Sequence, residues 1–196
     1  MPFLHPLAFQ FGGRCARAAV ASALAMVVAP AAHAAPPSPL TPLVDAAAQR
    51  LLIADPVAAS KWHSGGSIED PPRVGQVLVS VAAAAVADHL DADYVRRVFT
   101  DQIDATEAVE YARFSQWKLD PAAAPAAAPE LAASRSTIDA LNHTIVDEIA
   151  AQQNVLTSPD CGPAREEAID AVSAARELDP LYRRALEHAA RSYCPA

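Results

Sequence analysis

The segment that most constrains the fold runs from Phe99 to Trp117 and contains neither glycine nor proline. Its Ala, Glu and Gln residues favour the helical backbone, so the segment is predicted to form a long α-helix. A spacing of four and three residues aligns one stripe of side chains along this helix: Phe99, Ile103, Thr106, Glu110, Arg113 and Trp117. Such a stripe normally packs against other helices and is apolar. Here a threonine and a glutamate hold two successive positions, and a buried carboxylate is costly unless it is paired, protonated or used.

On this helix alone, Glu110 is better explained as a half-exposed residue at the edge of the stripe. The remaining composition supports a helical protein but does not explain the glutamate. Alanine is abundant, aromatic residues make up only 6% of the 196 residues, and no β-branched run alternates with polar residues. A chain of this length can bury a sizeable core. The sequence therefore predicts one all-α domain.

An export signal is predicted over residues 1–34. Two arginines precede an apolar run, and Ala32-His33-Ala34 is a small-x-small cleavage pattern. The run is too short to be a stable membrane anchor. Cleavage near Ala34 would leave residues 35–196 as the mature domain, either periplasmic or secreted. Loss of the two arginines would change the formal net charge from −8 to −10. A protein this acidic is poorly suited to bind nucleic acid or anionic membranes.

The cysteines agree with export. Cys15 would be removed with the signal, which leaves Cys161 and Cys194 in an oxidising compartment. An even number of cysteines there predicts one disulfide, and two free buried thiols are the alternative. The bond would join the start of the fifth expected helix to the end of the sixth and clamp a C-terminal helical hairpin.

Six helices are expected in the mature domain. Pro56 should kink or break the first, which begins at Leu43, because proline has no N–H to donate to the carbonyl of Leu52. Asp70-Pro71 and Asp179-Pro180 each combine a capping residue with proline at the first helical position. The expected helices are 43–61, 71–90, a long helix capped by residues 91–93 and ended by Asp120, a fourth begun by Ser134 after a proline-rich connector, 164–178, and a last one reaching Tyr193.

Four cations fall on stripes that should face inward on three of these helices: Arg50, Lys61, Arg73 and Arg135. Each of them, taken alone, is explained as a solvated cation at the edge of a helix. Combined with three polar residues, Asp70, Thr106 and Glu110, they predict a cavity that contains more positive than negative charge. Buried unpaired cations are costly, so the surplus requires an anionic guest, and arginines suit carboxylates. For Asp70, a purely structural role as a helix cap is equally open.

Covalent and metal chemistry find no support in the sequence. Ser, His and Asp are not arranged as a triad, and the two cysteines of the mature domain are assigned to structure. The six histidines are scattered, and no Cys-x-x-Cys or His-x-x-x-His pair occurs. Neither a metal nor a cofactor is predicted, and the site would bind and polarise its ligand.

Four segments are similar to the exported, all-helical chorismate mutases of the AroQ type, γ-subclass. They are LVDAAAQRLLIADPVAASKW, IEDPPRV, YVRRVFTDQIDATEAVEYARFSQWKL and SRSTIDALN. The resemblance extends from about Leu43 to Cys194. It implies the six-helix fold of that family, conversion of chorismate to prephenate by a [3,3] rearrangement in aromatic amino acid biosynthesis, and a homodimer with a complete site in each subunit.

The resemblance also implies roles for the site residues. Arg50 and Arg135 would bind the substrate's side-chain carboxylate and Arg73 its ring carboxylate. Lys61 and Glu110 would donate to the ether oxygen, so that Lys61, Glu110 and Arg50 are the catalytic residues. Asp70 would meet the ring hydroxyl and Thr106 would line the site. The family often has a polar side chain one turn after the position of Arg73, where this chain has Val77, so the adjacent Gln76 is a further candidate for substrate binding.

A different class of function remains open at this point. A helical exported protein that captures a small dicarboxylate without converting it would need the same cations. Glu110 favours catalysis, because capture of a dianion gains nothing from an acid placed opposite Lys61. A structural domain with neither activity would leave the four inward cations unexplained.

Overall fold

The computed structural model describes residues 37–195, so the expected export signal at residues 1–34 lies outside the described residues. Within 37–195 the chain forms eight α-helices and one 3-10 turn, and no β-strand. The helices are α1 (Thr41–Leu52), α2 (Ala54–Ser64), α3 (Pro71–Ala87), α4 (Ala92–Leu119), η1 (Pro121–Ala123), α5 (Leu131–Ala151), α6 (Gln153–Leu156), α7 (Cys161–Ala175) and α8 (Pro180–Ala189). The all-α prediction is confirmed. The six expected helices are present, the first divided into α1 and α2, and the single turn α6 was not expected.

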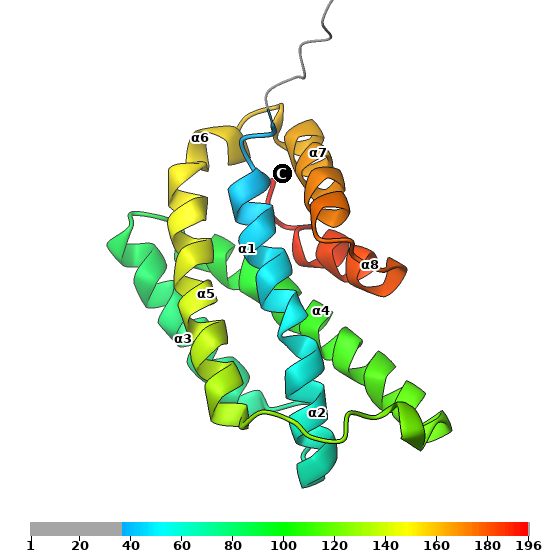
Figure 1. Ribbon diagram of the computed structural model, residues 1–196. Helices are drawn as coiled ribbons and strands as arrows, with labels where there is room; N and C mark the ends of the chain where they lie inside the picture. The colour runs from blue at the N-terminus through cyan, green and yellow to red at the C-terminus, as the bar shows by residue number, and fades with distance from the viewer. Residues whose placement is uncertain (1–36, 196) are drawn as a thin grey trace, which may run out of the picture. The chain divides into compact units, whose positions relative to one another are not determined.

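Helix α4 is the element around which the others pack. It contacts α2 and α3 near the predicted site and α8 along its middle, while α1 packs against α5 and α7 (Figure 1). The core between them is built from fully buried apolar side chains on several helices: Leu43, Leu51, Val95, Phe99, Ile145, Ile149 and Leu186. Phe99, Thr106, Glu110 and Trp117 of the α4 stripe are buried. The long helix therefore presents its polar residues to the inside of the molecule.

The break between α1 and α2 occurs at Ile53, three residues before Pro56. Proline is tolerated in the first turn of α2, where its missing N–H would have no helical partner. The backbone of Ile53 stays in the right-handed helical region, with φ −76° and ψ −10°, so α2 continues in nearly the direction of α1. Arg50 before the break and Lys61 after it consequently face the same cavity, as the stripe predicted.

Three aspartates begin helices as the sequence predicted. The carboxylate of Asp70 accepts the N–H of Arg73 at 3.1 Å, and Asp91 and Asp179 accept two backbone N–H groups each at the starts of α4 and α8. These bonds satisfy donors that have no partner within the helix. The cap at Asp70 fixes the first turn of α3, which carries Arg73.

Several helix boundaries differ from the predictions. Helix α1 begins at Thr41 and not at residue 43, α2 ends at Ser64 and not at residue 61, α3 ends at Ala87 and not at residue 90, and α7 ends at Ala175 and not at residue 178. Helix α5 begins at Leu131 and not at Ser134, whose side chain is buried, because the chain turns helical directly after Pro129 and Glu130. Helix α7 begins at Cys161 instead of residue 164, since Pro163 still falls within the first turn, where no N–H is required. Helix α8 ends at Ala189, four residues before the expected end at Tyr193.

The C-terminal segment after α8 is held by the predicted disulfide between Cys161 and Cys194. The preceding residue, Tyr193, is fully buried. Its backbone carbonyl accepts the hydroxyl of Tyr94 at 2.7 Å, and its own hydroxyl accepts the side-chain amide of Gln102 at 3.3 Å. The disulfide therefore joins the end of the chain to the start of α7, while Tyr193 holds it against the N-terminal half of α4. Among residues 37–195, no helix is both long and apolar enough to cross a membrane.

Candidate active site

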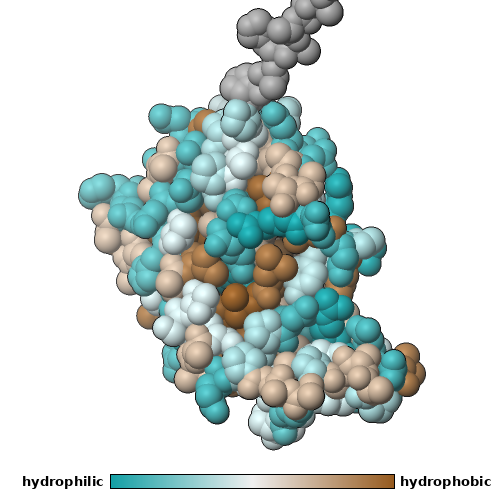
Figure 2. Space-filling model, in the orientation of Figure 1, coloured by the Kyte–Doolittle hydropathy of each residue, from teal (hydrophilic) through white to brown (hydrophobic). Residues whose placement is uncertain are grey.

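A cavity that is open to solvent lies between the first five helices. On the face seen in Figure 2, apolar side chains gather at the centre and hydrophilic side chains surround them. The cavity is lined by residues of α1 to α5 and of the loop before α3: Arg50, Val57, Lys61, Ile68, Asp70, Arg73, Val74, Val77, Ile103, Thr106, Glu107, Glu110, Leu131, Arg135 and Ile138. Four cations thus meet in a cavity with a largely apolar wall.

Arg50 is the most deeply placed of the cations, with only 4% of its surface exposed. Its Nε donates to Oδ1 of Asn142 at 2.8 Å, and its Nη1 donates to Oγ1 of Thr106 at 3.0 Å and to the carbonyl of Gln102 at 3.3 Å. Burial, followed by the nearby charge of Arg73, lowers the pKa of Arg50 to about 10. Arg50 therefore remains charged at neutral pH while all three of its hydrogen-bond acceptors are neutral.

The other two arginines are each paired with an aspartate across the cavity. Nη2 of Arg135 on α5 lies 2.5 Å from Oδ2 of Asp70, and Nη2 of Arg73 on α3 lies 2.5 Å from Oδ1 of Asp139 on α5. Both pairs are partly exposed to solvent. Asp70 therefore caps α3, as the sequence predicted, and also contacts a cation of the site, which was not predicted. Its contact with a ring hydroxyl stays a prediction.

Lys61 and Glu110 form a buried ion pair, with 2.8 Å between Nζ and Oε2. Nζ of Lys61 also donates to the backbone carbonyl of Ile68, in the loop before α3. Burial raises the pKa of Glu110 to about 7, and the contact with Lys61 offsets only part of this effect. Near neutral pH, Glu110 is therefore divided between a carboxylate that accepts from Lys61 and a carboxylic acid that can donate.

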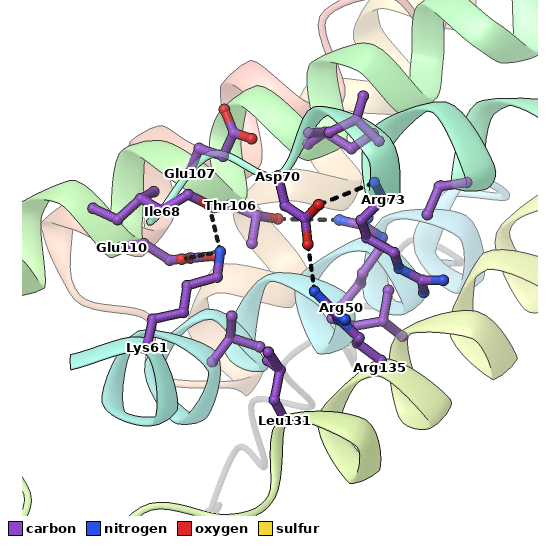
Figure 3. A pocket seen from close by; sticks show the side chains of 15 residues that line it. Arg50, Lys61, Ile68, Asp70, Arg73, Thr106, Glu107, Glu110, Leu131 and Arg135 are labelled. Atoms are coloured by element: carbon purple, nitrogen blue, oxygen red, sulfur yellow. Dashed lines mark hydrogen bonds and ion pairs between the residues drawn. The ribbon is translucent and has the colours of Figure 1, made fainter. Parts of the chain in front are cut away.

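The polar groups are separated into two ends of the cavity. Figure 3 shows Lys61 and Glu110 together at one end, Arg50, Arg73 and Arg135 at the other, and Asp70 between them. A ligand that fits this arrangement carries its negative charge at the arginine end and an acceptor atom at the lysine end. The residues lining the cavity include no serine, cysteine or histidine.

Of the predicted site residues, Arg50, Lys61, Asp70, Arg73, Thr106, Glu110 and Arg135 line this one cavity. Gln76 does not, because it is exposed on the outer side of α3. Val77 and Val81 define the inner face of that helix, and Gln76, the residue before Val77, is rotated by about 100° from it.

Several contacts in the site were not predicted from the sequence. Asn142 shares one stripe of α5 with Ile138 and Ile145, so a polar residue among isoleucines was a usable signal, but its bond to Arg50 was not predicted. Asp139 lies outside that stripe and carried no such signal. The carbonyl of Ile68 belongs to the backbone, so no side-chain pattern marks it.

A second polar cluster lies outside the cavity, between α4 and α8. Asp101, Asp104 and His188 each place a potential ligand atom within 4.8 Å of the others. Arg191 already supplies positive charge there, with its Nη2 2.6 Å from Oδ1 of Asp101. No metal-ligand spacing marked this cluster in the sequence, because the histidine comes from a different helix.

Comparison with known proteins gives one consistent result. The family model of chorismate mutase type II matches residues 41–111. A secreted chorismate mutase from Mycolicibacterium smegmatis is 59% identical over 173 residues, which cover 88% of this chain and 96% of that protein. A secreted chorismate mutase from Mycobacterium tuberculosis is 49% identical over 175 residues, which cover 89% of this chain and 88% of that protein.

Solved structures agree with the sequence comparison. A chorismate mutase from Burkholderia phymatum superposes with a TM-score of 0.77 at 32% identity and covers 81% of this chain and 98% of its own. A secreted chorismate mutase from Yersinia pestis, at 22% identity, has a TM-score of 0.63 and covers 81% of this chain and 96% of its own, which supports the fold alone.

Proposed function

The chain belongs to the chorismate mutases of type II, and we propose that it is an exported enzyme that rearranges chorismate to prephenate. The reaction is an isomerisation: the ether C–O bond of the enolpyruvyl group breaks as a new C–C bond forms, and no atom is gained or lost. The enzyme needs to hold the substrate in the reactive conformer and to stabilise the charge that develops on the ether oxygen.

The observation that carries this proposal is the buried charge of Arg50. Only neutral groups accept its hydrogen bonds, and an uncompensated cation in such a position is costly unless a ligand supplies the missing negative charge. Chorismate brings two carboxylates. Arg50 and Arg135 would bind the side-chain carboxylate, and Arg73 would bind the ring carboxylate at the same end of the cavity.

Lys61 and Glu110, at the other end, would donate to the ether oxygen. Lys61 is fixed from two sides, by Glu110 and by the carbonyl of Ile68, so its ammonium group is already oriented before the substrate binds. Glu110 donates only when it is protonated, and its raised pKa favours that state. Asp70 would meet the ring hydroxyl, and Thr106 would keep Arg50 in place.

The free energy that these contacts contribute is sufficient for the expected rate enhancement. A rate enhancement near a millionfold corresponds to about 8 kcal/mol of transition-state stabilisation. Charge-assisted hydrogen bonds contribute about 1.5–3 kcal/mol each, so a few of them, formed by preorganised groups, reach this value.

The organisation of the mature protein is part of the proposal. Residues 1–34 would be removed on export, and residues 35–196 would form the enzyme, either periplasmic or secreted. We also propose a homodimer with one complete site in each subunit. This is consistent with a cavity to which a single chain contributes all four cations.

The test is turnover by the purified mature protein. Chorismate is added, its absorbance is followed, and the product is quantified by chromatography. We expect prephenate to appear mole for mole with the chorismate consumed, and heat-denatured protein to give only the background rate. Saturable binding of chorismate without prephenate formation would instead identify a dicarboxylate-binding protein.

A further inference from the structure

The ion pairs of this protein fall into two geometric types. Arg113 binds Asp55 through two nitrogens, Nε at 2.6 Å and Nη2 at 3.1 Å, and Arg176 binds Asp45 through the same two nitrogens. Such a two-point contact uses one whole edge of the guanidinium group. These pairs lie outside the cavity and join α2 to α4 and α1 to the end of α7.

Arg73, in the cavity, is bound differently. A single nitrogen, Nη2, contacts Oδ1 of Asp139 at 2.5 Å, and within the described residues Nε and Nη1 make no hydrogen bond. A guanidinium group has five N–H donors in a fixed plane, so one contact leaves an entire edge available to a carboxylate. Asp139 therefore fixes the guanidinium group of Arg73 and leaves one edge of that group free to bind a carboxylate of a ligand.

Arg73 is also a residue whose position needs support. It lies in the first turn of α3, where the helix dipole disfavours a cation, and the charge of Arg50 is close to it. Both effects push the side chain of Arg73 towards solvent. The side chain of Asp139 is 49% exposed and that of Arg73 is 23% exposed, so the pair lies at the rim of the cavity.

We propose that Asp139 is a positioning residue for substrate binding, which holds Arg73 through one nitrogen so that its free edge faces the ring carboxylate. This inference rests on the proposed function. Asp139 does not touch the substrate. The contact with Asp139 orders Arg73 before the substrate binds and so lowers the entropic cost of binding. Replacing Asp139 should therefore weaken substrate binding more than it slows the chemical step.

The first test is steady-state kinetics of Asp139→Asn. We expect KM for chorismate to rise about fivefold to twentyfold while kcat changes by less than about threefold. Asp139→Glu should recover most of the lost affinity because it restores the charge. The control is Asp147→Asn, an equal change of charge at an exposed position of the same helix, which should leave both constants unchanged.

The second test asks whether Asp139 acts through Arg73. In an Arg73→Ala background, adding Asp139→Asn should have no further effect on KM, so that the two substitutions are strongly non-additive. Full additivity would overturn the proposal, and so would a KM that stays unchanged or falls in Asp139→Asn, since a fall would mean that Asp139 competes with the substrate. If the wild-type protein did not convert chorismate at all, the proposed function would be contradicted. This result differs from one in which the wild type is active but Asp139→Asn leaves KM unchanged, which contradicts only the role of Asp139.

Discussion

Burial acts in opposite directions on the two most enclosed ionisable residues of the site. Arg50 keeps its charge near neutral pH because its pKa, although lowered by burial, is still about 10. Glu110 is only partly ionised near neutral pH because burial raises its pKa to about 7. The sequence placed both on inward stripes but left the protonation state of Glu110 open, because the balance between burial and Lys61 depends on distances that only the folded chain defines.

Glu110 should therefore control the pH dependence of turnover. Below about pH 7 it carries the proton that the ether oxygen would accept, and above that pH it is increasingly ionised. We expect kcat/KM to fall as the pH rises through about 7. The fall of kcat should occur at a higher pH, since the bound dianion disfavours ionisation of a neighbouring carboxyl group.

Glu110→Gln is the variant that tests this assignment, because its amide donates a hydrogen bond without titrating. Its pH–rate profile should be flatter than that of the wild type, whereas Glu110→Ala should lose activity at every pH. Glu107→Gln, which removes the other glutamate lining the cavity, should retain the fall. A Glu110→Gln variant whose profile overlays the wild-type profile would leave Lys61 as the only donor.

At the scale of elements, the first turn of α3 links folding to the site. Asp70 caps this turn through one carboxylate oxygen and contacts Arg135 through the other. The sequence predicted the cap from Asp70-Pro71, and the resemblance implied a contact with the substrate's ring hydroxyl, but neither predicted the contact with Arg135. The contact with Arg135 joins residues 65 positions apart, so local sequence rules carry no information about it.

Two substitutions at Asp70 should separate these roles. Asp70→Asn keeps an effective helix cap, so the free energy of unfolding should change by less than about 0.5 kcal/mol. Asp70→Ala removes the cap and should lower it by about 1 kcal/mol. Both variants lose the charge beside Arg135 and should raise KM. Urea denaturation and steady-state kinetics measure the two effects, and equal stability of the two variants would contradict the capping role.

The helix pattern predicted the α1–α2 stripe correctly despite the break, because Ile53 keeps the helical direction. It failed at the starts of α5 and α7. The start of α5 was predicted from Ser134 as a capping residue, and the start of α7 was placed directly after Pro163. Both helices begin earlier, and neither begins with a side-chain cap. Gln76 lies outside the cavity because neighbouring residues of a helix point in directions about 100° apart. Val77 therefore occupies the inner face of α3, and Gln76 is exposed.

At the scale of the whole molecule, the C-terminal segment is attached at two points: the disulfide joins it to the start of α7, and Tyr193 joins it to the N-terminal half of α4. The disulfide spans 33 residues, and closing a loop of this length stabilises the folded chain by about 4 kcal/mol in the chain-entropy model. Cysteine number predicted the bond. The burial of Tyr193 was not predicted, since a tyrosine near a chain end gives no periodic signal.

Reduction of the disulfide should lower stability without abolishing activity. The direct contacts of Arg50 come from α4 and α5, and neither helix contains a cysteine. We expect a clearly lower urea midpoint after reduction and a kcat/KM within about threefold of the oxidised protein under native conditions. Thiol titration of the oxidised mature protein should find no free thiol. Loss of turnover without unfolding would show that the C-terminal segment also supports the site.

We propose that the charges of this cavity catalyse the rearrangement, and the most direct test removes Lys61, one of the two proposed donors to the ether oxygen. We would measure kcat/KM on chorismate for the wild type and for Lys61→Ala, with Lys118→Ala, an exposed lysine on α4, as the matched control. We expect a loss of more than tenfold for Lys61→Ala, which is more than about 1.4 kcal/mol of transition-state stabilisation, and no change for Lys118→Ala. A folded Lys61→Ala protein that retained more than about a tenth of the wild-type kcat/KM would contradict it.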